Sequence, residues 1–301
     1  MEAIEVAGVR KSFGDREVLK GVSFRVCRGE VFGLLGPNGA GKTTMIRILA
    51  GLLKQDSGQV RVMGSPEPWR VSELLGYLPE ERGVYRRARA VEFLRYLGEL
   101  RGMSREAAEA RALELLERLG LLPHARRELG RLSKGMQQKV QLAGAMVHDP
   151  QVLLLDEPFS GLDPVNTRQV ERLIGELRGE GKAVVLSTHM IERAESLCDR
   201  ILMLHMGRGV LHGSPEEIRA RYGHGRAVIE VAGSIPEVRG ARVAERRGGT
   251  AVLVVEEGSP GDVLKQLIEA GAEVRRFDSG SAPLHEIFVR VVEDEKGAGG
   301  G

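Results

Sequence analysis

The sequence has few aromatic residues, little cysteine and almost no excess of charge of either sign. Phenylalanine, tryptophan and tyrosine make up 4% of the 301 residues, and there are two cysteines. The 44 basic and 42 acidic residues give a net charge of +2, which is not the positive excess with which proteins neutralise the phosphates of DNA. We therefore expect no nucleic-acid partner.

Long hydrophobic runs are missing as well. The longest, such as Val152–Leu155 and Ala183–Leu186, are far shorter than the roughly 20 apolar residues of a membrane-spanning helix. The first residues, Met1–Glu5, have neither the basic start nor the apolar stretch of a secretory signal, so we expect a cytoplasmic protein. Cys27 and Cys198 have no CxxC spacing and predict neither a zinc site nor a disulfide; we expect both to be buried.

Hydrophobic patterning predicts an α/β fold for the first two thirds of the chain. Alternating apolar residues from Ile4 to Val26 indicate antiparallel strands, and helical spacing indicates a helical subdomain at about 86–150. Short apolar strands that alternate with helices then favour a parallel sheet covered on both faces. The predicted strands are 30–35, 152–155, 183–186 and 201–204, and the predicted helices are 43–52, 137–146, 165–177 and 190–197.

The pattern changes around Arg221 to Gly225, where we place a domain boundary. The first domain is therefore 1–222, followed by a small α+β domain at 223–295 and a flexible glycine-rich tail at 296–301. In the small domain we expect strands at 227–231, 241–245, 251–256 and 273–277, with a turn at Gly248–Gly249, and helices at 261–270 and 282–292.

A phosphate-binding loop is the strongest motif of the sequence. It has the spacing G-x-x-x-x-G-K-T and lies between a predicted strand and a predicted helix. Glycines let backbone N–H groups surround phosphate oxygens, Lys42 neutralises the β- and γ-phosphates, and Thr43 holds Mg²⁺. The residues that we expect to bind ATP here are Gly36, Pro37, Asn38, Gly39, Ala40, Gly41, Lys42, Thr43 and Thr44.

Two carboxylates follow the apolar strand 152–155 directly. Ligands of such sheets bind at the carboxyl ends of the strands, which places Asp156 and Glu157 beside the phosphate-binding loop. We expect Asp156 to reach Mg²⁺ and Glu157 to polarise the attacking water. An acidic pair after a strand is more often a helix cap, but the loop upstream favours the catalytic interpretation.

The segment Leu132-Ser133-Lys134-Gly135-Met136-Gln137-Gln138 resembles the LSGGQ-type signature of the ABC ATPases, a family of P-loop NTPases. Lys134 and Met136 depart from that pattern. The resemblance implies a cassette with an antiparallel β-subdomain and a helical subdomain. It also implies that Ser133, Gly135 and Gln137 close over the γ-phosphate held by an opposite subunit.

Smaller marks of the same family occur in the expected order. Ser160-Gly161-Leu162-Asp163 resembles the loop that crosses the dimer, so Asp163 would help to form the opposite site. His189 matches the switch histidine, and Phe13 stands where the family stacks an aromatic ring on adenine. Glu80 replaces the usual glutamine that meets Mg²⁺ and signals to the permease. The competing interpretation for Glu80 is a solvated charged turn.

The resemblance implies an ATP-hydrolysing subunit that powers a transporter, of a subclass with many exporters, through a separate membrane permease. The chain would then bind the cytoplasmic face of the membrane through that permease and pair with a second nucleotide-binding subunit; identical and related partners both stay open. The alternative is a soluble ABC ATPase that acts on ribosomes or DNA without a permease. We expect no metal besides Mg²⁺, because the other histidines lack paired ligand spacing: His124, His148, His205, His212 and His224.

Overall fold

The structure is a computed structural model that describes residues 2–80, 83, 85–222, 226–232, 236–247, 250–255, 259–278 and 282–298. The chain forms two compact units, Met1–Ser214 and Pro215–Gly301. The division comes eight residues before the expected boundary after residue 222, because helix α7 (Pro215–Tyr222) contacts helix α9 (Leu284–Ala298) of the second unit.

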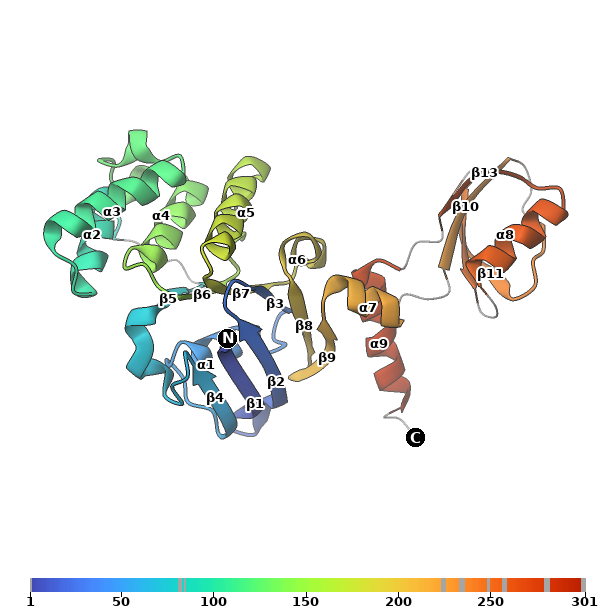
Figure 1. Ribbon diagram of the computed structural model, residues 1–301, viewed down its shortest axis with the longest axis horizontal. Helices are drawn as coiled ribbons and strands as arrows, with labels where there is room; N and C mark the ends of the chain where they lie inside the picture. Colours follow the sequence, from blue (N-terminus) through green and yellow to red (C-terminus); the bar gives the residue numbers. More distant parts are fainter. Residues whose placement is uncertain are drawn as a thin grey trace. The chain divides into compact units, whose positions relative to one another are not determined.

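An antiparallel sheet opens the first unit (Figure 1). Strands β1 (Glu2–Phe13), β2 (Arg16–Cys27) and β4 (Ser57–Val62) pair in the order β2-β1-β4. Inward and outward residues alternate along the second half of β2, so Val26 is buried and Cys27 faces outward. The expectation that both cysteines are buried is therefore wrong for Cys27 and correct for Cys198.

A six-stranded sheet forms the centre of the first unit, in the order β5-β6-β7-β3-β8-β9. Its strands are parallel except β9, which pairs antiparallel with β8. Every residue of β3, β6 and β7 is buried, as expected of strands covered on both faces. The elements are β3 (Val31–Leu35), β5 (Leu75–Leu78), β6 (Val152–Asp156), β7 (Ala183–Thr188), β8 (Arg200–His205) and β9 (Arg208–Gly213), with helices α1 (Lys42–Leu49), α5 (Pro164–Gly179) and α6 (Ile191–Leu197). The predicted α/β class is thus confirmed.

Three helices of the first unit pack against one another: α2 (Ala90–Leu100), α3 (Arg105–Arg118) and α4 (Lys134–Met146) (Figure 1). Serine hydroxyls accept backbone N–H groups at the starts of two of them, Ser104 for α3 and Ser133 for α4. The 3₁₀ helices of this unit are Pro68–Leu74, Leu122–His124 and Leu129–Arg131. No helix in the described part of the chain is long and apolar enough to span a membrane.

The second unit contains an antiparallel sheet with the order β11-β12-β10-β13. Its strands are β10 (Arg226–Ala232), β11 (Ala241–Arg247), β12 (Thr250–Val255) and β13 (Glu273–Asp278), and helix α8 (Pro260–Glu269) buries Val263 and Leu267 against Leu253. Helix α9 continues to Ala298, beyond the predicted end at residue 292 and into the expected tail, because the residues up to Lys296 include no proline or glycine. The predicted turn at Gly248–Gly249 lies outside the described residues.

Candidate functional site

The phosphate-binding loop connects β3 to α1, as the sequence predicts. Gly36, Gly39 and Gly41 have φ values of +143°, +80° and +107°, a region that side chains rarely allow. A Cβ atom at Gly36 would also collide with the backbone oxygen of Leu204. These glycines therefore let the loop curl tightly before α1 begins at Lys42.

The side chain of Lys42 folds back onto the loop that precedes it. Its ammonium donates to the carbonyls of Gly36 (2.8 Å) and Pro37 (3.3 Å), and its Nζ is 3.8 Å from Oε1 of Glu157. Burial lowers the pKa of Lys42, while the carboxylates of Glu157, Asp156 and Glu80 oppose that shift. The site thus concentrates one buried cation among acidic side chains.

Two carboxylates meet the loop where β6 ends. The Thr43 hydroxyl donates to Oδ1 of Asp156 at 3.3 Å, and Asp156 is fully buried. Oδ2 of Asp156 is buried and has no hydrogen-bond partner among the described residues. Mg²⁺ prefers oxygen ligands, either from the protein or from its water shell. The unpartnered Oδ2 of Asp156 and the nearby hydroxyl oxygen of Thr43 fit this preference.

Glu157 adopts an uncommon backbone conformation and is 7% exposed. Its φ is +49°, in the left-handed region that costs a non-glycine residue free energy unless its surroundings maintain it. Oε1 of Glu157 lies 3.0 Å from Nδ1 of His189, whose side chain is 57% exposed. The structure therefore brings the predicted Lys42, Glu157 and His189 together.

Ser187 is a residue of this site that we did not select from the sequence. It lies on β7, directly beside Asp156 on β6, and it is fully buried. Its hydroxyl donates to Oδ1 of Asp156 (2.5 Å) and accepts the backbone N–H of Glu157 (3.0 Å). The only signal in the sequence was its position two residues before His189.

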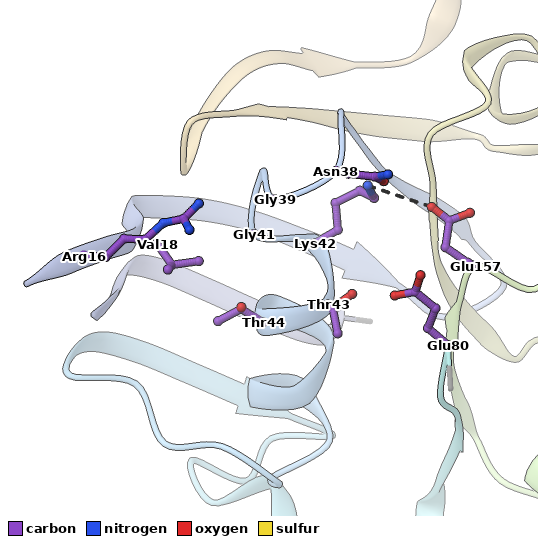
Figure 2. A pocket seen from close by; sticks show the side chains of 10 residues that line it. All are labelled: Arg16, Val18, Asn38, Gly39, Gly41, Lys42, Thr43, Thr44, Glu80 and Glu157. Carbon is purple, nitrogen blue, oxygen red and sulfur yellow. Dashed lines mark ion pairs between the residues drawn. The ribbon is translucent and has the colours of Figure 1, made fainter. Parts of the chain in front are cut away.

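A pocket of about 340 Å³ lies over the loop (Figure 2). Arg16 and Val18 of β2 lie on one side of it and Glu80 and Glu157 on the other, with Lys42 pointing toward Glu157 (Figure 2). Arg16 and Val18 were not predicted. The predicted residues that line the pocket are Asn38, Gly39, Gly41, Lys42, Thr43, Thr44, Glu80 and Glu157.

The signature residues do not line this pocket. Ser133 is exposed and caps α4 by accepting the N–H of Met136 at 3.2 Å. The side-chain amide nitrogen of Gln137 donates hydrogen bonds to the backbone carbonyls of Leu129 and Leu132, which precede α4. Asp163 is exposed and caps α5, and the backbone N–H of Asn166 lowers its pKa. Of the predicted residues outside the pocket, Ser133 and Asp163 are therefore exposed, whereas Gly135 is buried.

Phe13 is exposed at the end of β1, with 52% of its surface accessible. Nζ of Lys11 lies 5.5 Å from the centre of its ring. Phe13 is not among the residues that line the pocket, although Arg16 and Val18 of the following strand are. An exposed ring at this place remains available to a flat aromatic ligand.

Comparison with known proteins agrees with this geometry. The family described as "ABC transporter" matches residues 19–160, and the "ATP-binding protein DrrA1-3-like, C-terminal domain" matches residues 213–292. An uncharacterized ABC transporter ATP-binding protein of Methanocaldococcus jannaschii is 46% identical over 71% of this chain and 79% of its own length. The Nod factor export ATP-binding protein I of Rhizobium meliloti is 38% identical over 97% of this chain and 89% of its own.

Solved structures are similar to a large part of the chain as well. The "ATP binding subunit of ABC transporter" is 32% identical, with a TM-score of 0.67, and the match covers 73% of this chain and 93% of that one. The phosphate-binding loop, the paired carboxylates and these similarities lead to one assignment. The chain belongs to the ABC transporter ATP-binding proteins and is an ATP-binding and ATP-hydrolysing subunit of that family.

Proposed function

We propose that two copies of this chain bind head to tail and drive export through a separate membrane permease. Each ATP lies between the loop Gly36–Thr44 of one copy and the segment Ser133–Gln137 of the other. One observation supports this most strongly: the pocket includes the phosphate-binding loop and Glu157 but none of the signature residues. In this proposal a single chain would present half of a site on each of two surfaces.

The phosphate-binding residues neutralise and position the triphosphate. The buried Lys42 ammonium faces the β- and γ-phosphates and exchanges its carbonyl partners for phosphate oxygens. Thr43, Asp156 and Glu80 hold Mg²⁺, whose charge offsets the negative charge of the phosphates. The Phe13 ring stacks on adenine. Positioning and charge neutralisation are the main sources of catalysis in phosphoryl transfer.

Glu157 acts as the general base toward the attacking water. Its Oε1 is held at 3.0 Å from Nδ1 of His189, and this contact keeps the carboxylate at the edge of the pocket. In this proposal His189, whose side chain is 57% exposed, also hydrogen-bonds the γ-phosphate. Across the dimer, Ser133 and Gly135 of the second copy enclose the same phosphate, and Asp163 places the segment that joins the sites.

Glu80 connects the nucleotide to the permease. It lines the pocket and lies two residues after the end of β5, so a change at the phosphates reaches the segment that leads to α2. Export is the direction that the relative from Rhizobium meliloti supports, because its name specifies Nod factor export and the match covers 97% of this chain. The second unit has the family domain of DrrA-like proteins and serves regulation or subunit contact.

The test is steady-state ATPase activity of Glu157→Gln, together with light scattering to follow ATP-dependent dimers. We expect turnover to fall by about 100-fold or more, because the general base is lost, while the ATP-bound dimer accumulates. Glu106→Gln, an exposed glutamate of α3, is the matched control and keeps wild-type activity. Wild-type turnover in Glu157→Gln would disprove the assignment of the base.

The permease partnership needs its own measurement. Cells that contain the chain are fractionated with and without detergent, and with and without nuclease. A permease-bound subunit stays with the membranes until detergent releases it. Recovery with ribosomes or DNA, released by nuclease, would instead support an ABC ATPase that works without a permease.

A further inference from the structure

Ser187 has an unusual place among the strand residues of the central sheet. It is the neighbour of Asp156 in the register between β7 and β6, and both residues are fully buried. A hydroxyl in such surroundings is costly unless its hydrogen-bonding groups have partners. Both partners of Ser187 belong to the nucleotide site.

The bond to Asp156 fixes which oxygen of that carboxylate is occupied. Oδ1 accepts from Ser187 at 2.5 Å and from Thr43 at 3.3 Å. Oδ2 is left buried and without a partner in the described part of the chain. Ser187 thus orients the carboxylate of Asp156 so that Oδ1 is hydrogen-bonded and Oδ2 is available to a ligand.

The bond to Glu157 supports a strained backbone. At φ +49° the chain turns sharply after β6, and the Ser187 hydroxyl accepts the N–H group of the residue that makes this turn. The N–H of Ser160 bonds the carbonyl of Glu157 at 3.1 Å and supports the turn from the other side. Without Ser187, a buried N–H loses its partner, and the backbone of Glu157 can relax toward more common φ values.

The neighbouring Thr188 shows that this arrangement is specific to one hydroxyl. Thr188 is also fully buried, yet the hydrogen bond found for its hydroxyl among the described residues is with the N–H of Met190 at 3.1 Å, outside the nucleotide site. We propose that Ser187 is a positioning residue that sets Asp156 toward the metal ion and Glu157 toward the attacking water through one shared hydroxyl. This inference depends on the roles of Asp156 and Glu157 proposed above.

The test compares Ser187→Ala with Ser187→Thr, which keeps the hydroxyl. Thr167→Val is the matched control, because Thr167 is 2% exposed and its hydroxyl has no partner among the described residues. Three quantities are measured: kcat and KM for ATP, Mn²⁺ affinity in the presence of ADP by electron paramagnetic resonance, and ADP affinity without metal.

For Ser187→Ala we expect kcat to fall about 10- to 100-fold and the Mn²⁺ affinity to fall about 10-fold, as for lost supporting contacts around metal ligands. KM and metal-free ADP affinity stay within about twofold, because the phosphate-binding loop is unchanged. Ser187→Thr recovers most of both losses, and Thr167→Val shows none.

Unchanged kcat and Mn²⁺ affinity in Ser187→Ala overturn the proposal. Equal losses in Ser187→Ala and Ser187→Thr, or an equal loss of metal-free ADP affinity, also overturn it, because the effect then comes from the fold.

The Glu157→Gln background separates this inference from the function on which it depends. There, with Mg²⁺ at saturation, Ser187→Ala should no longer lower kcat, whereas Mn²⁺ binding should still weaken because it depends on Asp156. If Glu157→Gln alone keeps wild-type turnover, the proposed base is wrong, and the Mn²⁺ measurement still tests the link from Ser187 to Asp156. A further fall in kcat of the double variant at saturating Mg²⁺ contradicts the claim that Ser187 acts through Glu157.

Discussion

The phosphate half of the site, Gly36–Thr44 with Asp156 and Glu157, is built very differently from the signature half, Ser133–Gln137 with Asp163. In the phosphate half the key side chains are buried and bonded to one another. In the signature half, Ser133 and Asp163 are exposed, and their side chains accept hydrogen bonds from the first turns of their own helices. The phosphate half is therefore already ordered within a single chain, whereas in the proposed dimer the signature half would offer exposed helix starts to the second copy.

The largest effect is expected when the signature half alone is changed. At Gly135 an added Cβ would lie 3.4 Å from its nearest atoms, on Asn166 and Leu162, which is ordinary contact. We expect Gly135→Asp to bind ATP normally as a single chain but to lose ATPase activity by about 100-fold, because its carboxylate repels the phosphate held by the partner. Gly135→Asn has nearly the same shape without the charge and should lose much less. Loss of single-chain ATP binding in Gly135→Asp would contradict the division into halves.

A smaller effect is expected at the edge of the phosphate half. Phe13→Ala removes the exposed ring that we assign to adenine, and base stacking of this kind corresponds to about a 10-fold rise in KM for ATP. Phe13→Trp should keep the wild-type KM, and tripolyphosphate, which has no base, should bind both variants equally in a competition assay. Equal KM values for Phe13→Ala and wild type would remove Phe13 from the site.

The smallest expected effect is a change in stability at the loop between α4, which begins with the signature segment, and β6, which carries Asp156. Asp149 lies between α4 and β6 and forms an ion pair with buried Lys182, whose ammonium lowers the pKa of Asp149 below 3.8. A lowered acid pKa stabilises the fold above pH 3.8, and this contribution is lost as the pH falls through the folded-state value. Asp149→Asn should therefore reduce the free energy of unfolding by about 1 kcal/mol at pH 7, a modest value because this carboxylate is largely exposed.

Urea denaturation at several pH values checks this expectation. The difference between wild type and Asp149→Asn should shrink at acidic pH and be constant near neutrality. Asparagine tolerates the positive φ of this position, +56°, so the substitution changes the charge and little else. ATPase activity at pH 7 should be unaffected; a strong loss would show that this loop itself governs the chemistry.

The sequence predicted the parts of the fold that local patterns determine. The strand, glycine loop and helix around Lys42 depend on contiguous residues, and so do the buried strands that carry Asp156 and Ser187. Strand β4 was not predicted, because it is polar and its pairing partner β1 is about fifty residues earlier in the chain. Local propensity is a weak guide to such long-range pairs.

The site was predictable to the extent that motifs specify it. Glu157 and His189 come together at 3.0 Å although they are far apart in the chain, which family resemblance suggested and spacing alone could not. Arg16, Val18 and Ser187 were missed for a physical reason. Their roles depend on how β2 packs over the loop and on the register between β6 and β7, which no local pattern encodes.

Mixing two inactive variants tests whether the phosphate half of one chain meets the signature half of another. Lys42→Ala removes the phosphate half and Gly135→Asp removes the signature half, so a mixed dimer contains one intact site and one site with both defects. We predict that each variant alone is inactive and that ATPase activity returns when they are combined, at a level set by the fraction of mixed dimers. If the mixture stays inactive while both proteins fold and pair with wild-type chain, the two halves do not meet between chains, and the account is wrong.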